Sequence, residues 1–263
     1  MWPVEGQGGR LIMADFISGS FYFLTDVGKV RTTNEDYADA RANAFGQLIL
    51  VVADGMGGQN KGDYASNTLG KGIIKDFVEF GKPFTNSKQA SKWLYKTINK
   101  YNRQIYNHAH KYTDYIGSGT TLTVAMLFSG KLLLAQVGDS RAYWINDNNQ
   151  LEQLTTDQTY VQYLIATRKI TASEASSHPD RHKLTNAIGV KYNALVDFKE
   201  YPYNHQRILV CSDGLYNNVP YYDLQSILKS KETPERKCLQ LIAFGNFNGG
   251  SDNMAVVIWE ANN

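Results

Sequence analysis

The chain has 263 residues, of which 43% are hydrophobic and 20% are charged, a composition typical of soluble globular proteins. Its 27 Lys and Arg residues nearly balance its 25 Asp and Glu residues. Because the positive charge is spread without a basic block, neither nucleic acid nor a membrane surface is expected as a partner.

The cysteines and the N-terminal composition indicate the compartment and the domain boundaries. Cys211 and Cys238 lack metal-site spacing, and Cys211 lies in an apolar run, so we expect buried, reduced thiols and a cytoplasmic location. No stretch approaches the ~18 apolar residues of a membrane span. Residues 1–12 are Gly-rich and lack the apolar core of a signal peptide. Without repeats or Pro-rich linkers, we expect a flexible extension over residues 1–18 and one domain over residues 19–263.

The first half of the chain predicts strands, then a helical pair, then more strands. Apolar runs indicate strands over residues 19–27 and 45–54. Apolar residues spaced on one face indicate helices over residues 65–80 and 87–109, with Ser87 as the N-cap of the second helix. Thr, Val, Leu and aromatic residues predict four further strands, over residues 120–128, 131–137, 141–145 and 151–154.

The second half mixes short helices with strands. A polar segment over residues 157–177 is expected to be mostly helical, and its stretch from Thr171 to Glu174 matches a capping box. Because strands outnumber helices and the helices are consecutive, the pattern favours an α+β domain in which helices cover antiparallel sheets. The remaining expected elements are strands over residues 196–201, 207–211 and 254–260, and helices over residues 221–229 and 235–244.

Short acidic signatures are the most informative feature of the chain. Asp54 and Asp213 directly follow or nearly follow apolar runs, and Asp252 precedes one. Carboxylates at strand ends that converge on one cleft are tolerable only if cations occupy it. All-oxygen ligation suits Mg²⁺ or Mn²⁺ rather than zinc, so the sequence predicts a hard-metal enzyme. The signatures are Asn34-Glu35-Asp36, Asp54-Gly55-Met56-Gly57-Gly58, Ser212-Asp213-Gly214 and Gly250-Ser251-Asp252-Asn253.

Together with further motifs, these signatures resemble the metal-dependent (PPM, or type 2C) protein Ser/Thr phosphatases in their compact bacterial form. The resemblance extends over about residues 21–260 and implies a four-layer αββα sandwich of two antiparallel sheets, with the metal cleft at one end. The further motifs are Thr25-Asp26-Val27-Gly28, Arg31-Thr32-Thr33, Gly117-Ser118-Gly119-Thr120-Thr121, Val137-Gly138-Asp139-Ser140-Arg141-Ala142 and His178-Pro179-Asp180-Arg181.

The resemblance implies a metal ligand set for two core ions of Mn²⁺ or Mg²⁺. Asp54 matches the aspartate that bridges the two ions, and Gly55 matches the residue that gives a backbone carbonyl to one of them. Asp213 and Asp252 match the remaining ligands of the second ion.

The remaining site residues carry supporting roles in the family. Glu35 and Asp36 match the acidic pair that holds metal-bound waters. Asp139, with Asp213, matches a looser site for a third metal ion. Arg31 matches the arginine that binds the substrate phosphate.

The implied reaction is hydrolysis of phosphoserine and phosphothreonine by in-line attack of a metal-bridging hydroxide. Two cations would neutralise the repulsion between hydroxide and a phosphate dianion, and Arg31 would match the phosphate oxygens with its planar fork. No protein nucleophile is then needed. Cys211 lacks the Cys-x5-Arg loop of cysteine phosphatases, because Tyr216 and Asn217 stand where the arginine would be. Arg141 is expected to pair with an acidic neighbour rather than with substrate.

Several positions depart from the family pattern. Met56 stands where many eukaryotic members carry a histidine, so no histidine is assigned as general acid. Residues 157–190 correspond to a flap beside the cleft, and Gln158, Arg168 and His182 differ from residues common there in bacterial relatives. These changes are expected either to alter substrate preference and flap mobility or to be neutral, and to leave the chemistry intact.

The resemblance also implies the partners. We expect a monomer that acts on phosphorylated proteins, the targets of a cognate Ser/Thr kinase. One alternative is a non-catalytic member that binds phosphoproteins, against which the complete acidic set argues. Another is a phosphatase devoted to one regulatory partner, which normally carries sensory or membrane regions that this sequence lacks.

Overall fold

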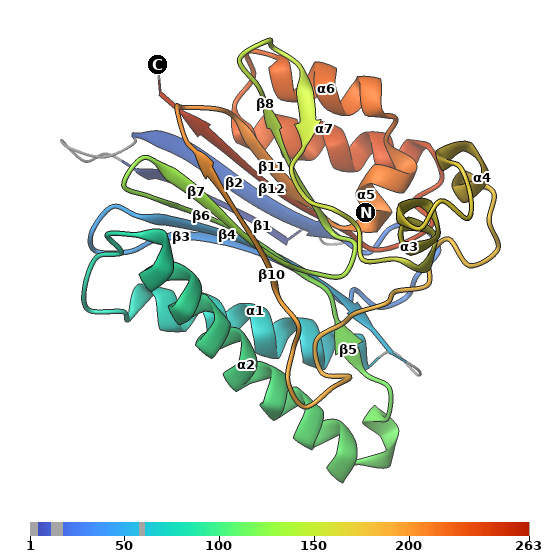
Figure 1. The fold of residues 1–263 in the computed structure, drawn as a ribbon. Helices are drawn as coiled ribbons and strands as arrows, with labels where there is room; N and C mark the ends of the chain where they lie inside the picture. Colours follow the sequence, from blue (N-terminus) through green and yellow to red (C-terminus); the bar gives the residue numbers. More distant parts are fainter. Residues whose placement is uncertain (1–4, 12–17, 58–60, 263) are drawn as a thin grey trace.

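Two antiparallel β-sheets pack face to face, and helices cover the outer face of each sheet (Figure 1). The computed structural model describes residues 5–11, 18–57 and 61–262. This arrangement confirms the predicted α+β class and the four-layer αββα sandwich. Among the described residues, no helix is both long enough and apolar enough to cross a membrane.

The first sheet pairs strands from both ends of the chain. Helices α5, α6 and α7, all from the C-terminal third, cover its outer face (Figure 1). Its strand order is β1 (Glu5–Leu11), β2 (Gly19–Asp26), β12 (Met254–Ala261), β11 (Ile208–Cys211), β8 (Arg141–Ile145) and β9 (Leu151–Gln153). The helices are α5 (Asp213–Asn218), α6 (Tyr221–Lys229) and α7 (Pro234–Phe247).

The second sheet is built mainly from the first half of the chain, and the long helices α1 (Gly62–Val78) and α2 (Ser87–Lys111) cover it. A short 3₁₀ turn (Thr113–Tyr115) follows α2. The strand order is β10 (Asp197–Pro202), β7 (Lys131–Val137), β6 (Leu122–Phe128), β4 (Leu48–Met56) and β3 (Asp36–Ala42), with β5 (Gly119–Thr120) paired to the end of β4.

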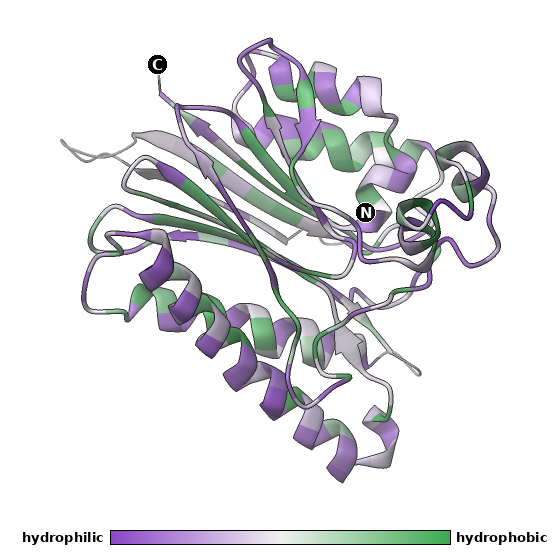
Figure 2. Ribbon diagram, in the orientation of Figure 1, coloured by the Kyte–Doolittle hydropathy of each residue, from purple (hydrophilic) through white to green (hydrophobic). Residues whose placement is uncertain are grey.

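The continuous apolar run of β4 reflects burial on both faces. Ile49 and Val51 belong to the core beneath α1 and α2, whereas Leu50 and Val52 belong to the core between the sheets. Central strands between two packed layers are expected to be apolar at every position. Figure 2 shows the consequence, with hydrophobic residues along the central strands and hydrophilic residues along the outer side of α2.

Some elements differ from the sequence predictions. Asn86, not Ser87, caps α2, because its side chain accepts a hydrogen bond from the amide of Gln89. The segment over residues 157–177 contains two short helices, α3 (Tyr160–Ala166) and α4 (Ala172–Ser176), and the predicted capping box of α4 is present.

The N-terminal segment also differs from its prediction. Glu5–Leu11 forms strand β1 where a flexible extension was expected. The glycines that favoured flexibility allow close packing instead, because a Cβ at Gly8 or Gly9 would lie within 2.6 Å of the rings of Tyr22 or Phe21. The other residues of the expected extension, except Ser18, lie outside the described part of the chain.

Candidate metal centre

Strand pairing brings two of the predicted site carboxylates together. Asp36 opens β3 and lies directly opposite Asp54 near the end of β4. Residues directly opposite in an antiparallel pair share one face, and the next pair on this face, Ala38 and Val52, belongs to the core between the sheets. Both carboxylates therefore lie at the end of the space between the two sheets.

Hydrogen bonds from neutral side chains link the other sheet to this pair. Ser212, which follows β11, donates its hydroxyl to Oδ2 of Asp36 at 2.6 Å and accepts a bond from the amide of Ala255. The backbone of Asp54 is fixed by Thr121, whose Oγ1 accepts from the Asp54 amide at 3.0 Å. The Ser212–Asp36 bond thus joins the two sheets where their acidic residues lie, and Thr121 fixes Asp54 within its own sheet.

Three further carboxylates come from turns at the same end of the sandwich. Asp139 lies in the turn between β7 and β8, Asp213 begins α5 after β11, and Asp252 precedes β12. Gly214 permits the close approach of these last two turns, because a Cβ there would lie 1.9 Å from the carbonyl oxygen of Asn253.

Burial and mutual repulsion perturb the acidic residues. Burial raises the pKa of Asp36 to about 8, and repulsion from Asp213 and Asp252 adds to this rise. Burial likewise raises the pKa of Asp139 to about 7, again with a contribution from Asp213. The pKa values of Asp54 and Asp213 are also raised, first by burial and then by neighbouring carboxylates. These groups are close enough to disfavour one another's ionised forms.

Glu35 is held between the end of β4 and the start of α1. Oε1 of Glu35 accepts a hydrogen bond from the amide of Gly62 at 2.7 Å, and its carbonyl accepts from the amide of Gly55 at 3.1 Å and from Ser66 Oγ. A Cβ at Gly55 would lie 2.5 Å from the carbonyl oxygens of Glu35 and Gly62, so only glycine fits there. Glu35 therefore holds the start of α1 against the end of β4.

Arg31 and Asp252 form an ion pair at the mouth of the site. Nη2 of Arg31 lies 2.9 Å from Oδ2 of Asp252, and the two side chains are 51% and 38% exposed. The same bond raises the pKa of Arg31. A predicted phosphate-binding residue and a predicted metal ligand are thus each other's partners in this structure.

Polar residues attach residues 157–190, the segment expected to form a flap, to the acidic site. Arg141 pairs with Asp157 at 2.6 Å and lies 3.6 Å from the ring centroid of Tyr216, which confirms the expected acidic partner. Gln158 accepts from the amide of Gly138 and donates to Asp197. His182 brings Nδ1 to 3.9 Å from Oδ2 of Asp213.

Asn253 positions the site, although the sequence indicated no role for it beyond its place in the motif Gly250-Ser251-Asp252-Asn253. Its Oδ1 accepts from the amide of Glu35 at 2.9 Å, and its Nδ2 donates to the carbonyls of Val27 and Thr33. It is buried and joins the turn before β12 to the connection between β2 and β3, which is distant in the sequence. The only sequence signal was its position after Asp252.

The donor set fits hard cations with open coordination. Within the described residues, no three His, Cys, Asp or Glu side chains are grouped closely enough to hold a metal ion by themselves. Magnesium-type sites commonly use one or two carboxylates and complete their shell with water and carbonyl oxygens. Buried carboxylates with raised pKa values and a closely packed glycine backbone are compatible with such sites.

Comparisons with known proteins agree with this geometry. Residues 29–237 match the family described as Protein phosphatase 2C. The serine/threonine phosphatase stp of Listeria welshimeri is 37% identical over 241 residues, which cover 91% of this chain and 95% of that protein. The crystal structure of Stp1 from Staphylococcus aureus superposes with a TM-score of 0.85 at 33% identity, covering 92% of this chain and 95% of the other. The S. agalactiae serine/threonine phosphatase also gives a TM-score of 0.85, at 30% identity, over 91% of this chain and 98% of the other. The chain therefore belongs to the protein phosphatase 2C family of metal-dependent protein phosphatases.

Proposed function

We propose that this protein hydrolyses phosphoserine and phosphothreonine in other proteins, with Mn²⁺ or Mg²⁺ bound at the acidic end of the sandwich. The observation that carries the proposal is the group of buried or partly buried carboxylates, Asp36, Asp54, Asp139 and Asp213, whose pKa values are raised by desolvation and by neighbouring carboxylates. The similarity to serine/threonine phosphatases supports the choice of phosphoserine and phosphothreonine.

The proposed ligands come from four chain segments. Asp54, the carbonyl of Gly55, Asp213 and Asp252 would hold two core ions, and Asp139 with Asp213 would hold a third, weaker one. When bound, the cations would lower the pKa of a coordinated water toward neutrality and neutralise the phosphate charge.

The remaining charged residues of the site act around that centre. Asp36, held by Ser212, would orient water beside Asp54. Glu35 would position Gly55 and the start of α1, since its side chain is already bonded to Gly62.

Arg31 would bind the phosphate oxygens of the substrate. It can leave Asp252 at little cost, because an ion pair this exposed contributes at most about 1 kcal/mol. A guanidinium stays charged throughout the reaction and presents two parallel donors to phosphate.

The expected partners follow from this chemistry. We propose a monomer that acts on phosphorylated proteins, including targets of a cognate Ser/Thr kinase. A cytoplasmic location is supported by Cys211 and Cys238, which are free and buried.

The decisive experiment is phosphate release from a phosphothreonine peptide by protein treated with EDTA and then titrated with Mn²⁺. We expect turnover only with metal, and none from Asp213→Asn, which should remain folded. Asp114→Asn, at an exposed aspartate after α2, is the matched control and should keep wild-type turnover.

Turnover by folded Asp213→Asn would contradict the ligand assignment. Absence of turnover by folded wild-type protein at millimolar Mn²⁺, together with retained phosphopeptide binding, would instead favour a non-catalytic binding protein.

A further inference from the structure

Strand β3 forms the outer edge of its sheet, and its hydrogen bonding shows which backbone groups face outward. The amide of Gly55 donates to the carbonyl of Glu35. This bonded pair is adjacent to the opposed pair Asp36 and Asp54. In an antiparallel pair, hydrogen-bonded and non-bonded positions alternate. The odd-numbered residues of β3 therefore bond to β4, and the even-numbered residues point their N–H and C=O groups away from it.

Side chains already occupy two of these outward positions. The amide of Asp36 donates to Asn34 Oδ1 at 3.1 Å. At Ala40, the amide donates to Asp39 Oδ1 at 2.7 Å and the carbonyl accepts from Arg41 Nη1 at 2.9 Å. In the described part of the chain, Ala38 lies between them with no such side-chain partner and no strand on its outer side.

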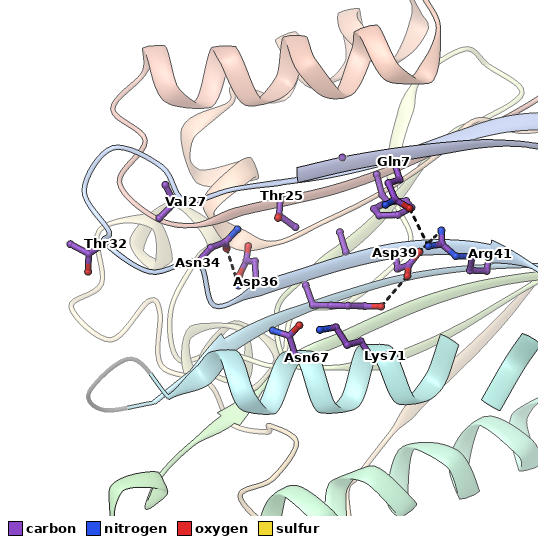
Figure 3. A pocket seen from close by; sticks show the side chains of 14 residues that line it. Gln7, Thr25, Val27, Thr32, Asn34, Asp36, Asp39, Arg41, Asn67 and Lys71 are labelled. Carbon is purple, nitrogen blue, oxygen red and sulfur yellow. Dashed lines mark hydrogen bonds and ion pairs between the residues drawn. The ribbon is translucent and has the colours of Figure 1, made fainter. Parts of the chain in front are cut away.

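Ala38 opens into a groove that continues to the acidic site. The groove has a volume of about 780 Å³ and is bounded by β1 and β2 on one side and by α1 on the other. Asn34 and Asp36 line one end, and Arg41 lines the other (Figure 3). A polypeptide lying along β3 would therefore run directly to the proposed metal centre.

The charge on the α1 side of the groove favours an acidic occupant there. Asp39 is neutralised by Arg41 at 2.7 Å and accepts a bond from the Tyr37 hydroxyl. Asn67 and Lys71 project toward the groove from α1 (Figure 3). Lys71 is exposed and forms no ion pair with a described residue, so it supplies an uncompensated positive charge.

Building on the proposed function, we infer that the outer edge of β3 binds the substrate polypeptide beside its phosphorylated residue as an added strand. One substrate residue would pair with the N–H and C=O of Ala38. Two residues of a strand span about 7 Å, so the paired residue lies two or three positions from the phosphorylated one. An acidic substrate side chain one or two positions farther away would meet Lys71. Main-chain pairing supplies affinity here, and Lys71 supplies sequence preference.

The test compares a phosphothreonine peptide, with acidic residues four positions to either side, against p-nitrophenyl phosphate, which cannot reach the groove. Ala38→Pro removes the outward N–H and leaves the β3–β4 bonds intact, because proline is tolerated on the outer side of edge strands. We expect its kcat/KM for the peptide to fall roughly three- to tenfold, the effect of one lost hydrogen bond, with p-nitrophenyl phosphate within about twofold of wild type.

Ala42→Pro is the matched control. The backbone N–H of Ala42 also points away from β4, but Ala42 does not line the groove. Both substrates should therefore keep their wild-type kcat/KM. Lys71→Glu should lower kcat/KM for the acidic peptide and leave p-nitrophenyl phosphate unaffected.

A second measurement uses wild-type protein and peptides N-methylated at one backbone position each. With wild-type protein, methylation at the paired residue should lower kcat/KM as much as Ala38→Pro does. With Ala38→Pro, the same methylation should lower kcat/KM no further, because the hydrogen bond is already absent. Loss of p-nitrophenyl phosphate hydrolysis in Ala38→Pro would mean that the substitution damages the site itself. The methylation scan in the wild-type protein then tests the inference without this variant.

Two results would overturn the inference while leaving the proposed function intact. These are wild-type peptide hydrolysis by Ala38→Pro, and a methylation scan without a sensitive position. Failure of wild-type protein to hydrolyse either substrate with Mn²⁺ would instead refute the proposed function, and the inference with it.

Discussion

Replacing Asp139 by asparagine should stabilise the metal-free protein at neutral pH and above. Burial raises the pKa of Asp139 from 3.8 to about 7, and one pH unit corresponds to about 1.4 kcal/mol. The ionised carboxylate therefore costs the folded state on the order of 4 kcal/mol above pH 7. An asparagine of the same size avoids this cost but leaves a buried amide partly unpaired, at about 1–3 kcal/mol. The net gain expected is roughly 1–3 kcal/mol.

The sign of this effect depends on pH. Because the pKa of Asp139 is higher in the folded state than in the unfolded state, the contribution of Asp139 to wild-type stability falls as pH rises from about 4 to about 7 and is constant above. The variant lacks this fall. Below pH 4 both states of wild type are protonated, so the variant should be equal to wild type or slightly less stable.

Thermal denaturation in EDTA at pH 4 and pH 8 measures this difference. At pH 8 the melting temperature of Asp139→Asn should exceed that of wild type by roughly 2–12 °C, from about 2–4 °C per kcal/mol for a chain of this length. Added Mn²⁺ should reduce the difference, since a cation relieves the repulsion in wild type. A variant no more stable than wild type at pH 8, or a difference independent of pH, would refute the reasoning.

Three further substitutions test separate parts of the site. Arg31→Ala should lower kcat/KM for p-nitrophenyl phosphate about 10- to 100-fold, because two charge-assisted bonds to phosphate are lost, and should change the free energy of unfolding by less than about 1 kcal/mol. Arg141→Met should destabilise the protein by about 3 kcal/mol in urea denaturation, because it leaves Asp157 partly buried without its partner. Cys211→Ala should keep kcat/KM within about twofold and wild-type Cys211 should resist alkylation, since the thiol is fully buried and burial raises its pKa to about 12. Full activity of Arg31→Ala, unchanged stability of Arg141→Met or loss of turnover in Cys211→Ala would contradict these expectations.

The sequence predicted the elements that depend on local pattern. The apolar run of β4 and the one-sided stripe of α2 are visible without tertiary knowledge, and both were found within a few residues of their predicted ends. The acidic residues at strand ends were predicted for the same reason, since a carboxylate after an apolar run marks where a strand leaves the core.

Strands β1 and β3 escaped prediction because their sequences have low strand propensity. β3 reads Asp-Tyr-Ala-Asp-Ala-Arg-Ala, and β1 contains three glycines. Each lies at the edge of a sheet, where backbone pairing with a strongly apolar neighbour, β4 or β2, supplies the order that the side chains do not. Edge strands of this kind are specified by the tertiary fold rather than by their own pattern.

The residues that position the site were missed for a related reason. Ser212, Asn253 and Thr121 each bond to an acidic site residue that lies 67 to 218 positions away in the sequence, and no local spacing indicates them. All three are neutral and buried. They hold a group of carboxylates whose mutual repulsion would otherwise spread the ends of the strands.

Because neutral residues position the site and charged residues bind at it, substitutions of the two kinds should have different effects. The bonds of Asn253 to the Val27, Thr33 and Glu35 backbones do not depend on a cation, whereas its neighbour Asp252 exchanges between Arg31 and, as proposed, a metal ion. Removing a carboxylate charge therefore relieves repulsion without removing a bond that holds the turns together. Removing Asn253 leaves the buried amide of Glu35 and two partly buried carbonyls unpaired and should cost about 1–3 kcal/mol or more. Substitution of the acidic residues is thus expected to lower activity while leaving the fold intact. Substitution of the neutral residues is expected to lower stability first.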